Sequence, residues 1–157
     1  MDFGVIRRIT TTCDLEKIIE LERKCFNNEV AYTAKQLRYL TTKANSTCLL
    51  ETTQDALRGF IIVLYKNGTQ VAGIEILNVD PMHRGNGIGK KLLKAAEEEM
   101  YPRGINKIRL EVSVGNTPAI NLYERSGFRR SAILKNYYRY EHHRSLDAFR
   151  MVKEIVT

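Results

Sequence analysis

Apolar positions along the chain follow two periodicities, one typical of strands and one typical of helices. Spacings of two predict seven strands, and spacings of three and four predict four helices. Helix starts are indicated by Asp14 as an N-cap, by Thr33 with Gln36 as a capping box, and by Thr117 as an N-cap before Pro118. The predicted strands cover residues 3–9, 46–53, 57–66, 69–79, 105–114, 128–140 and 146–156, and the predicted helices cover residues 15–26, 33–40, 88–100 and 119–126.

The order of these elements predicts how the sheet is connected. Asn67-Gly68 between two strands is a strong signal for a type I′ hairpin turn, so the strands before residue 80 form an antiparallel meander. The strand that follows the helix at 88–100 returns after a crossover and lies parallel to its predecessor. We find no internal repeat or linker and expect one domain over residues 1–157, with an α+β fold and a mixed, mostly antiparallel sheet.

Length and composition agree with this interpretation. A chain of 157 residues with 43% apolar residues is long enough to bury a core without disulfides. Its apolar runs are too short for a membrane span and its first residues do not resemble a signal peptide, so we expect a cytoplasmic protein that is not bound to a membrane. Cys13, Cys25 and Cys48 are widely spaced and odd in number, which fits neither a disulfide framework nor a zinc site.

The net charge of +7 is unevenly distributed along the chain. Residues 1–83 contain 10 Lys/Arg and 10 Asp/Glu, whereas residues 84–157 contain 15 and 8. A basic half can serve nucleic acid, but it can equally serve a small anion with several charges. Because basic and aromatic residues are interleaved only at 137–140, we rank nucleic acid as the weaker interpretation.

The loop between the strand at 69–79 and the next helix carries alternate glycines at Gly85, Gly87 and Gly89. Glycines leave the backbone bare where the first N–H groups of a helix have no partner, so an anion can approach these groups closely. Arg84 and Lys90 add positive charge. The spacing fits neither a dinucleotide fingerprint nor a nucleotide P-loop. We interpret the loop as a phosphate site for another ligand.

Arg84, Gly87 and Gly89 resemble the acyl-CoA signature of the GNAT superfamily of N-acetyltransferases, Arg/Gln-x-x-Gly-x-Gly/Ala after a strand. Residues 110–128 independently resemble the second block of that family, Asn-x-x-Ala-x-x-x-Tyr-x-x-x-Gly-Phe. At closer range the chain is similar to the branch of protein N-terminal acetyltransferases that includes the ribosomal-protein alanine acetyltransferases. The resemblance implies a three-layer α/β/α GNAT fold with a splayed parallel pair at its centre, acetyl-CoA as the cofactor, and an amine as the acceptor.

Two side chains are candidates for the acid and base that acetyl transfer requires. Glu111 lies in an apolar strand, where a partly buried carboxylate is a usable base, although a surface position on an edge strand is the alternative. By resemblance, Tyr123 gives its phenolic proton to the leaving sulfur, with core packing as the alternative. Glu75 is a second candidate base, because a period of two places it on the face of Leu77 and Val79.

The resemblance also assigns the cofactor site. The backbone of the strand at 69–79 pairs with the pantetheine arm like an added strand, and Asn116 binds the cofactor, although it is also suited to an Asx-turn. The full set expected to bind acetyl-CoA is Leu77, Asn78, Val79, Arg84, Gly85, Asn86, Gly87, Ile88, Gly89, Lys90, Asn116 and Tyr123.

The acceptor site is expected between the loop after the first helix and the loop before the last strand. By resemblance it includes Phe26, Glu29, Tyr32, Tyr137 and Tyr138, with a solvated loop for Glu29 and strand packing for the two later tyrosines as alternatives.

The loop at 139–146 differs from its relatives, because it contains His142-His143 and no glycine, and acceptor specificity therefore stays open. Two adjacent histidines without a third ligand do not indicate a metal site, and we expect no metal. The preferred acceptor is a protein or peptide N-terminus, with a ribosomal protein as one candidate. A lysine or small-amine acceptor and a non-catalytic binding module are the alternatives, and we expect a monomer or weak dimer.

Overall fold

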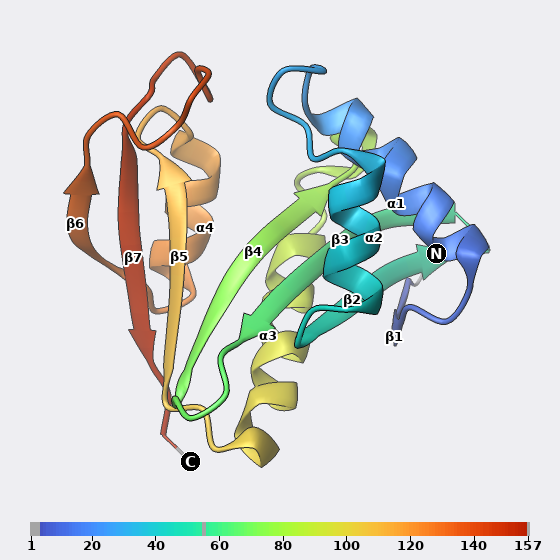
Figure 1. Cartoon of the computed structure of the whole chain (residues 1–157), viewed down its shortest axis with the longest axis horizontal. Helices are drawn as coiled ribbons and strands as arrows, with labels where there is room; N and C mark the ends of the chain where they lie inside the picture. Colours follow the sequence, from blue (N-terminus) through green and yellow to red (C-terminus); the bar gives the residue numbers. More distant parts are fainter. Residues whose placement is uncertain (1–3, 55, 157) are drawn as a thin grey trace.

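The computed structural model describes residues 4–54 and 56–156, which form a seven-stranded sheet with helices on both faces (Figure 1). Helices α1 and α2 cover one face, and α3 and α4 cover the other. The predicted α+β, three-layer fold is thereby confirmed. The strands are β1 (Val5–Arg8), β2 (Ser46–Thr53), β3 (Ala56–Tyr65), β4 (Val71–Val79), β5 (Lys107–Ser113), β6 (Arg129–Leu134) and β7 (Ala148–Glu154). The helices are α1 (Thr12–Cys25), α2 (Ala34–Thr42), α3 (Ile88–Met100) and α4 (Thr117–Arg125), with short 3-10 turns at Pro81–His83 and Tyr101–Arg103.

The sheet has the order β1-β2-β3-β4-β5-β7-β6, and β4 and β5 form its parallel pair. This pair is joined only at its lower end in Figure 1, where Val71, Ala72 and Gly73 face residues 107–109. Beyond Gly73 the two strands separate, while each keeps its antiparallel neighbour on the other side. The predicted splayed pair is therefore present, and it leaves the facing edges of β4 and β5 unpaired over the upper part of both strands.

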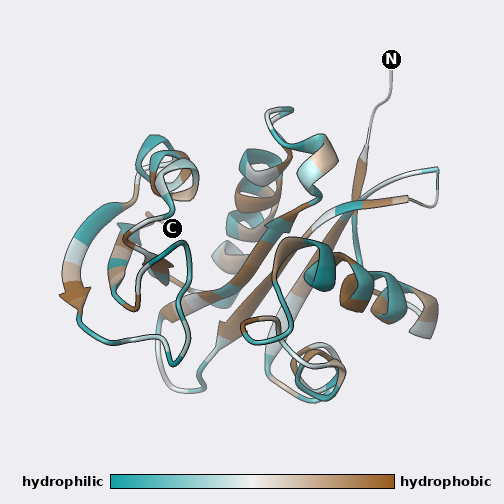
Figure 2. Cartoon of the chain, turned by 90° about the horizontal axis from the view of Figure 1, so that it is seen from above, coloured by the Kyte–Doolittle hydropathy of each residue, from teal (hydrophilic) through white to brown (hydrophobic). Residues whose placement is uncertain are grey.

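The sheet separates two apolar cores. Leu92, Ile108 and Met151 belong to the core under α3 and α4, whereas Ile18 and Leu37 belong to the core under α1 and α2. Figure 2 shows the apolar positions along the sheet and on the helix faces turned toward it. Burial of these side chains is the main favourable term for the fold. Within residues 4–54 and 56–156, no helix is both long and apolar enough to cross a membrane.

A β-bulge in β4 changes which side chains share a face. Successive residues of β3 face Ile76 and then Ile74, so Glu75 is the extra residue. Past this point the alternation is reversed. Leu77 and Val79 pack with Ile74 on the α3 side, whereas Ile76 packs on the α1 side. The prediction that Glu75 shares a face with Leu77 and Val79 is therefore wrong, because a strict period of two does not survive a bulge.

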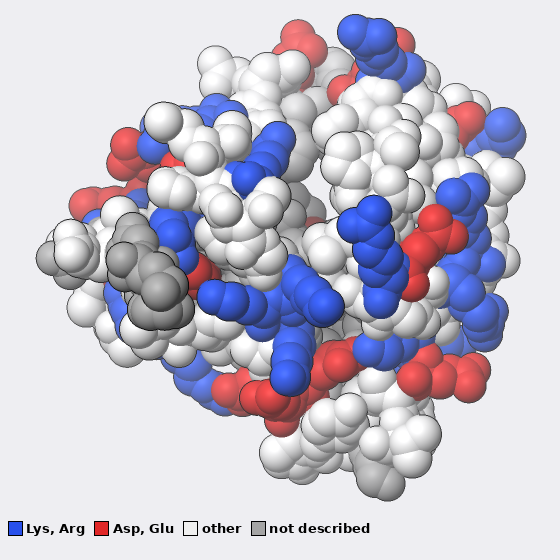
Figure 3. Space-filling view, turned by 180° about the vertical axis from the view of Figure 1, so that it is seen from behind, with Lys and Arg blue, Asp and Glu red and all other residues white. Residues whose placement is uncertain are grey.

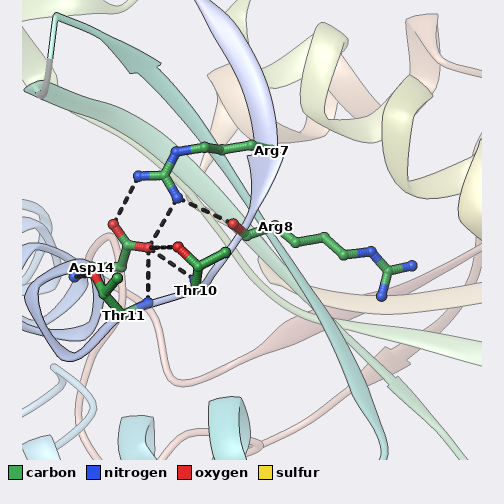
Figure 4. A network of polar contacts seen from close by, with 5 residues as sticks. All are labelled: Arg7, Arg8, Thr10, Thr11 and Asp14. Carbon is green, nitrogen blue, oxygen red and sulfur yellow. Dashed lines mark hydrogen bonds and ion pairs between the residues drawn. The ribbon is translucent and has the colours of Figure 1, made fainter.

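The start of α1 lies earlier than predicted. Thr11 is the N-cap, and Asp14 is the third helical residue of a capping box, with each side chain bonded to the backbone of the other. Asp14 also accepts two hydrogen bonds from the Arg7 guanidinium at 2.8 and 2.9 Å and one from the Thr10 N–H (Figure 4). The Arg7 hydrogen bonds hold the pKa of this carboxyl well below its usual range. Asp14 is therefore not the N-cap, and it fastens α1 to β1 as well as completing the capping box.

Two further local predictions are wrong. Asn116, not Thr117, is the N-cap of α4, and its side-chain oxygen accepts the Ala119 N–H at 3.3 Å. The predicted Asn67-Gly68 turn is present, but only Gly68 has a positive φ, at +81°. A type I′ turn requires positive φ at both central residues, whereas a single positive φ at the second is typical of type II.

Strand β6 is shorter than the predicted 128–140 and ends at Leu134. The chain turns out of the sheet at Asn136, where φ is +52°. Its N–H donates to the Asp147 carboxylate at 2.9 Å, which fixes the turn. Tyr137 and Tyr138 therefore lie on a loop instead of a strand, and we call residues 135–147 the β6–β7 loop. Phe3, in the predicted first strand, lies outside the described residues.

Candidate active site

A cavity of about 190 Å³ opens where β4 and β5 separate. The view from behind shows a hollow between the two halves of the molecule, with Lys and Arg side chains gathered beside it (Figure 3). In Figure 1 the α1–α2 loop and the β6–β7 loop flank the same end of the opening. The cavity is lined by Phe26, Tyr32, Ile74, Glu75, Ile76, Leu77, Asn78, Leu110, Glu111, Val112, Ser113, Asn116, Ala119, Tyr123, Tyr137, Tyr138, His142 and His143.

Glu111 of β5 contributes a carboxylate to this cavity. Its Oε2 accepts a hydrogen bond from Arg150 Nε at 3.2 Å, and Arg109 Nε lies 3.6 Å away. Tyr137 donates weakly to the other carboxylate oxygen, at 3.4 Å. The side chain is 17% exposed, so it is neither isolated in the core nor fully solvated. The guanidinium groups of Arg150 and Arg109 hold this carboxylate in place in the wall of the cavity.

Tyr123 of α4 lines the same cavity from the opposite side of the sheet opening. Its ring packs edge-on against Phe128, with 5.7 Å between the ring centroids. Burial raises the pKa of its phenol above the ordinary value of 10.0. The hydroxyl therefore stays protonated at neutral pH and is available as a proton donor. Both expected properties of Tyr123, core packing and a place in the site, are found together.

The bulge aims Glu75 toward the α1–α2 loop. Its carboxylate accepts a hydrogen bond from the hydroxyl of Tyr32. Burial and this hydrogen bond raise the pKa of the Tyr32 phenol. Glu75 thus lies with its phenol partner on the α1 side of the cavity, while Glu111 lies on the β5 side. The geometry brings both candidate bases to one cavity.

A fully buried glutamate joins α1 to β4 behind the cavity wall. Glu22 accepts hydrogen bonds from the Tyr32 N–H at 2.8 Å and from the Asn78 side-chain amide at 2.5 Å. Burial raises the pKa of Glu22 above 4.5 and the two hydrogen bonds oppose that shift. Because Tyr32 and Asn78 both line the cavity, Glu22 fixes the α1–α2 loop relative to the splayed strand.

The glycine loop ends at the N-terminus of α3, as predicted. Gly87 is the N-cap, with a φ of +77°, and no side chain caps the first N–H groups. These groups are therefore free to receive an anion. Lys90 and Lys94 extend the positive charge along α3, where they line a second cavity of about 250 Å³ between α3 and the segment that follows α4. A cofactor phosphate placed at this loop would enter a basic environment.

The structure brings most of the expected residues together but leaves some apart. The α1–α2 loop contributes Phe26 and Tyr32 to the cavity, whereas Glu29 is exposed outside it. Asn116 lines the cavity, but its side-chain oxygen already caps α4. The remaining residues expected to hold the cofactor are Val79 and residues 84–90. They lie at the adjoining end of β4, in the glycine loop and in the first turn of α3.

Glu22 and His142 shape the site but were not assigned a role from the sequence. Glu22 lies on the apolar face of the predicted first helix. A charged residue on a face that packs against the core could have indicated a buried carboxylate with hydrogen-bond partners. His142 was noted only as a departure from the family pattern. Its ring stacks on Tyr138, with 3.8 Å between centroids, and this contact has no sequence signal.

Comparison with known proteins agrees with this geometry. The sequence model of the acetyltransferase (GNAT) family matches residues 15–128. The chain is 43% identical to streptothricin acetyltransferase of Streptomyces lavendulae over 72 residues, which are 46% of this chain and 38% of that protein. It is 30% identical over 138 residues to the ribosomal protein bS18-alanine N-acetyltransferase of Salmonella typhimurium, which covers 83% of this chain and 84% of that protein. With several curated relatives, streptothricin acetyltransferase among them, the match spans only 38% to 43% of the relative's length.

Among solved structures, the ribosomal-protein-S18-alanine N-acetyltransferase from Escherichia coli superposes with a TM-score of 0.85 at 26% identity. The superposition covers 99% of this chain and 96% of that chain. Both the sequence match and the structural match thus extend over the glycine loop and over the strand and helix that carry Glu111 and Tyr123. On these grounds the chain belongs to the acetyltransferase (GNAT) family.

Proposed function

We propose that the protein transfers an acetyl group from acetyl-CoA to the N-terminal α-amine of a protein or peptide. The observation that carries this proposal is the placement of Glu111 and Tyr123. They come from β5 and α4, yet both line the cavity where β4 and β5 separate. Similarity to N-terminal acetyltransferases that act on a ribosomal protein supports the choice of acceptor, and a ribosomal-protein N-terminus is the first acceptor to test.

Acetyl-CoA would supply the thioester, and the chain offers two sets of groups to hold it. The uncapped N–H groups of α3, with Arg84 and Lys90 nearby, suit the pyrophosphate. The unpaired edge of β4 at residues 77–79 suits the amide groups of the pantetheine arm, which would add to the sheet as a short strand.

Glu111 would remove the proton from the acceptor amine, directly or through one water molecule. Arg150 and Arg109 hold its carboxylate in place. An α-amine has a pKa of about 8, compared with about 10.4 for lysine, so it needs less help from a base. Glu111 is therefore better matched to an N-terminus than to a lysine side chain.

Tyr123 would return a proton to the sulfur as the thiolate leaves. Its raised pKa keeps the phenol protonated until that step. The amine attacks the thioester carbonyl directly, since no nucleophilic side chain is required. Burial raises the pKa of Cys25 and raises that of Cys48 to about 12, so these thiols remain protonated and take no part.

Paired substitutions test the assigned roles. Glu111→Gln and Tyr123→Phe are each expected to lower kcat by about 10²- to 10⁴-fold. The matched controls are Glu154→Gln on β7 and Tyr101→Phe after α3, both exposed and outside the cavity. Unchanged turnover in the double variant Glu111→Gln/Tyr123→Phe would show that the assigned mechanism is wrong.

A small-amine or lysine acceptor is the second candidate, because the chain also resembles streptothricin acetyltransferase over 72 residues. An acceptor array with acetyl-CoA separates the two functions. It would contain peptides with free and with blocked N-termini, free lysine and small amines. Transfer to lysine or small amines but never to a free N-terminus would refute the proposed acceptor. Absence of any transfer by the wild-type protein would favour a binding module.

A further inference from the structure

The β6–β7 loop is held against the start of α4. Ser113 donates its hydroxyl hydrogen to the His142 carbonyl at 2.5 Å. The next carbonyl, of His143, lies so close to Gly115 that an added Cβ there would be 2.1 Å from its oxygen. Within the loop, His142 and Ser145 exchange two backbone hydrogen bonds, at 2.9 and 3.1 Å. The loop is therefore a fixed wall of the cavity with a defined side-chain arrangement.

The His142 ring extends this wall toward the other side of the cavity. It stacks on Tyr138 of the same loop, with 3.8 Å between the centroids and 22° between the planes. It also lies 6.2 Å from the ring of Phe26, which ends α1. A ring nitrogen lies 3.0 Å from the Tyr140 carbonyl, which fixes its orientation. The imidazole thus reaches between the β6–β7 loop and the end of α1.

The room that remains in the cavity is limited. The cavity has a volume of about 190 Å³ and is open to solvent, so the limit on the first acceptor side chain is set by the rings that line its acceptor end. Flat rings of Phe26, Tyr32, Tyr138 and His142 line the acceptor end, and packed aromatic rings cannot give way as flexible side chains do. A bulky first side chain would have to displace this stack.

We propose that His142 closes the acceptor end of the cavity and restricts the first residue of the acceptor to a small side chain, such as glycine, alanine or serine. This inference rests on the proposed N-terminal acetylation. It adds a specificity residue, in a position where the sequence departs from the family pattern. Tyr138 supports the His142 ring from behind, and Phe26 faces it from α1.

The test compares two peptides that differ only in the first residue, alanine or leucine. Wild-type kcat/KM is expected to favour alanine by at least about tenfold, within the range that pocket size alone provides. His142→Ala should reduce that preference by about tenfold, mainly through faster reaction of the leucine peptide. His142→Phe keeps an aromatic ring in the stack and should keep the preference. Tyr140→Ala removes an exposed ring of the same loop outside the cavity and should behave as wild type.

Each other outcome decides against the inference. If His142→Ala slows both peptides equally, the residue only supports the loop. If the wild type accepts alanine and leucine equally well, the cavity does not select by size, while N-terminal acetylation stands. If the wild type acetylates lysine or small amines but neither peptide N-terminus, the proposed function fails and this inference fails with it.

Discussion

Replacement of Glu22 tests whether the buried link between α1 and β4 holds the acceptor side of the cavity. Glu22→Ala removes the acceptor of two hydrogen bonds and leaves the Tyr32 N–H and the Asn78 amide without that partner. Hydrogen bonds to a charged group contribute about 1.5–3 kcal/mol each. The desolvation of the carboxylate, which raises its pKa, opposes this gain. We expect a net loss of about 2–4 kcal/mol of unfolding free energy.

Thermal unfolding is the assay, because a loss of this size lowers the midpoint by roughly 5–15 °C in a chain of this length. The KM for the acceptor peptide should rise, since Tyr32 loses the bond that fixes its backbone, while the KM for acetyl-CoA changes less. Glu22→Gln keeps one acceptor oxygen, and its amide can pair with Asn78 once that side chain turns over, so it should lose only about 1 kcal/mol.

The stability difference between the wild type and Glu22→Gln should depend on pH, and the raised pKa of Glu22 fixes the direction of that dependence. The pKa of Glu22 is raised in the folded state. Its contribution to stability is therefore fully present below about pH 4.5, the ordinary pKa, and is lost as the pH rises through the pKa of the folded state. The difference in unfolding free energy between the wild type and Glu22→Gln should therefore be largest near pH 5 and smallest near pH 8.5. A Glu22→Ala protein within about 0.5 kcal/mol of wild type would refute the reasoning.

Three further substitutions probe other contacts, each with its own measurement. Arg58→Met leaves the buried Glu51 carboxylate without its bidentate partner and should cost about 3–5 kcal/mol in denaturant unfolding, most of which the added change Glu51→Leu should restore. Gly115→Ala places a Cβ 2.1 Å from the His143 oxygen, so acceptor kcat/KM should fall roughly tenfold to a hundredfold without a matching change for acetyl-CoA. Gly87→Ala forces a non-glycine residue to a φ of +77°, and the midpoint of unfolding should fall by the equivalent of roughly 1–2 kcal/mol.

The fold was predictable because its signals are local. Alternation of apolar residues defined the strands, and the glycine loop and the Asn116-to-Phe128 block have fixed spacings that survive in a single sequence. Glu111 could be proposed because it is an acid within an apolar strand, and Tyr123 because it matches a position of the second block. Both line one cavity because β4 and β5 separate beyond Gly73 and α4 borders that opening.

The parts that were missed depend on contacts between distant residues. The side chain of Glu22 pairs with Asn78, 56 positions later, and no spacing rule connects them. The β-bulge at Glu75 reverses which residues of β4 point to each face of the sheet, and a search for period-two alternation cannot detect a bulge. The path of the β6–β7 loop depends on positive φ at two successive residues, His143 and Arg144, which is an uncommon conformation for non-glycine residues.

The short contact between β4 and β5 also links ligand binding to folding. Over residues 74–79, β4 has a strand partner on its β3 side and none on its β5 side, so the sheet is one strand short along this stretch. A ligand whose amides occupy that gap completes the ladder in the folded chain and has no equivalent place in the unfolded one. Its binding free energy is then added to the stability of the protein by mass action, growing with the logarithm of ligand concentration above the Kd. Such a ligand would supply the strand that the sheet lacks between β4 and β5.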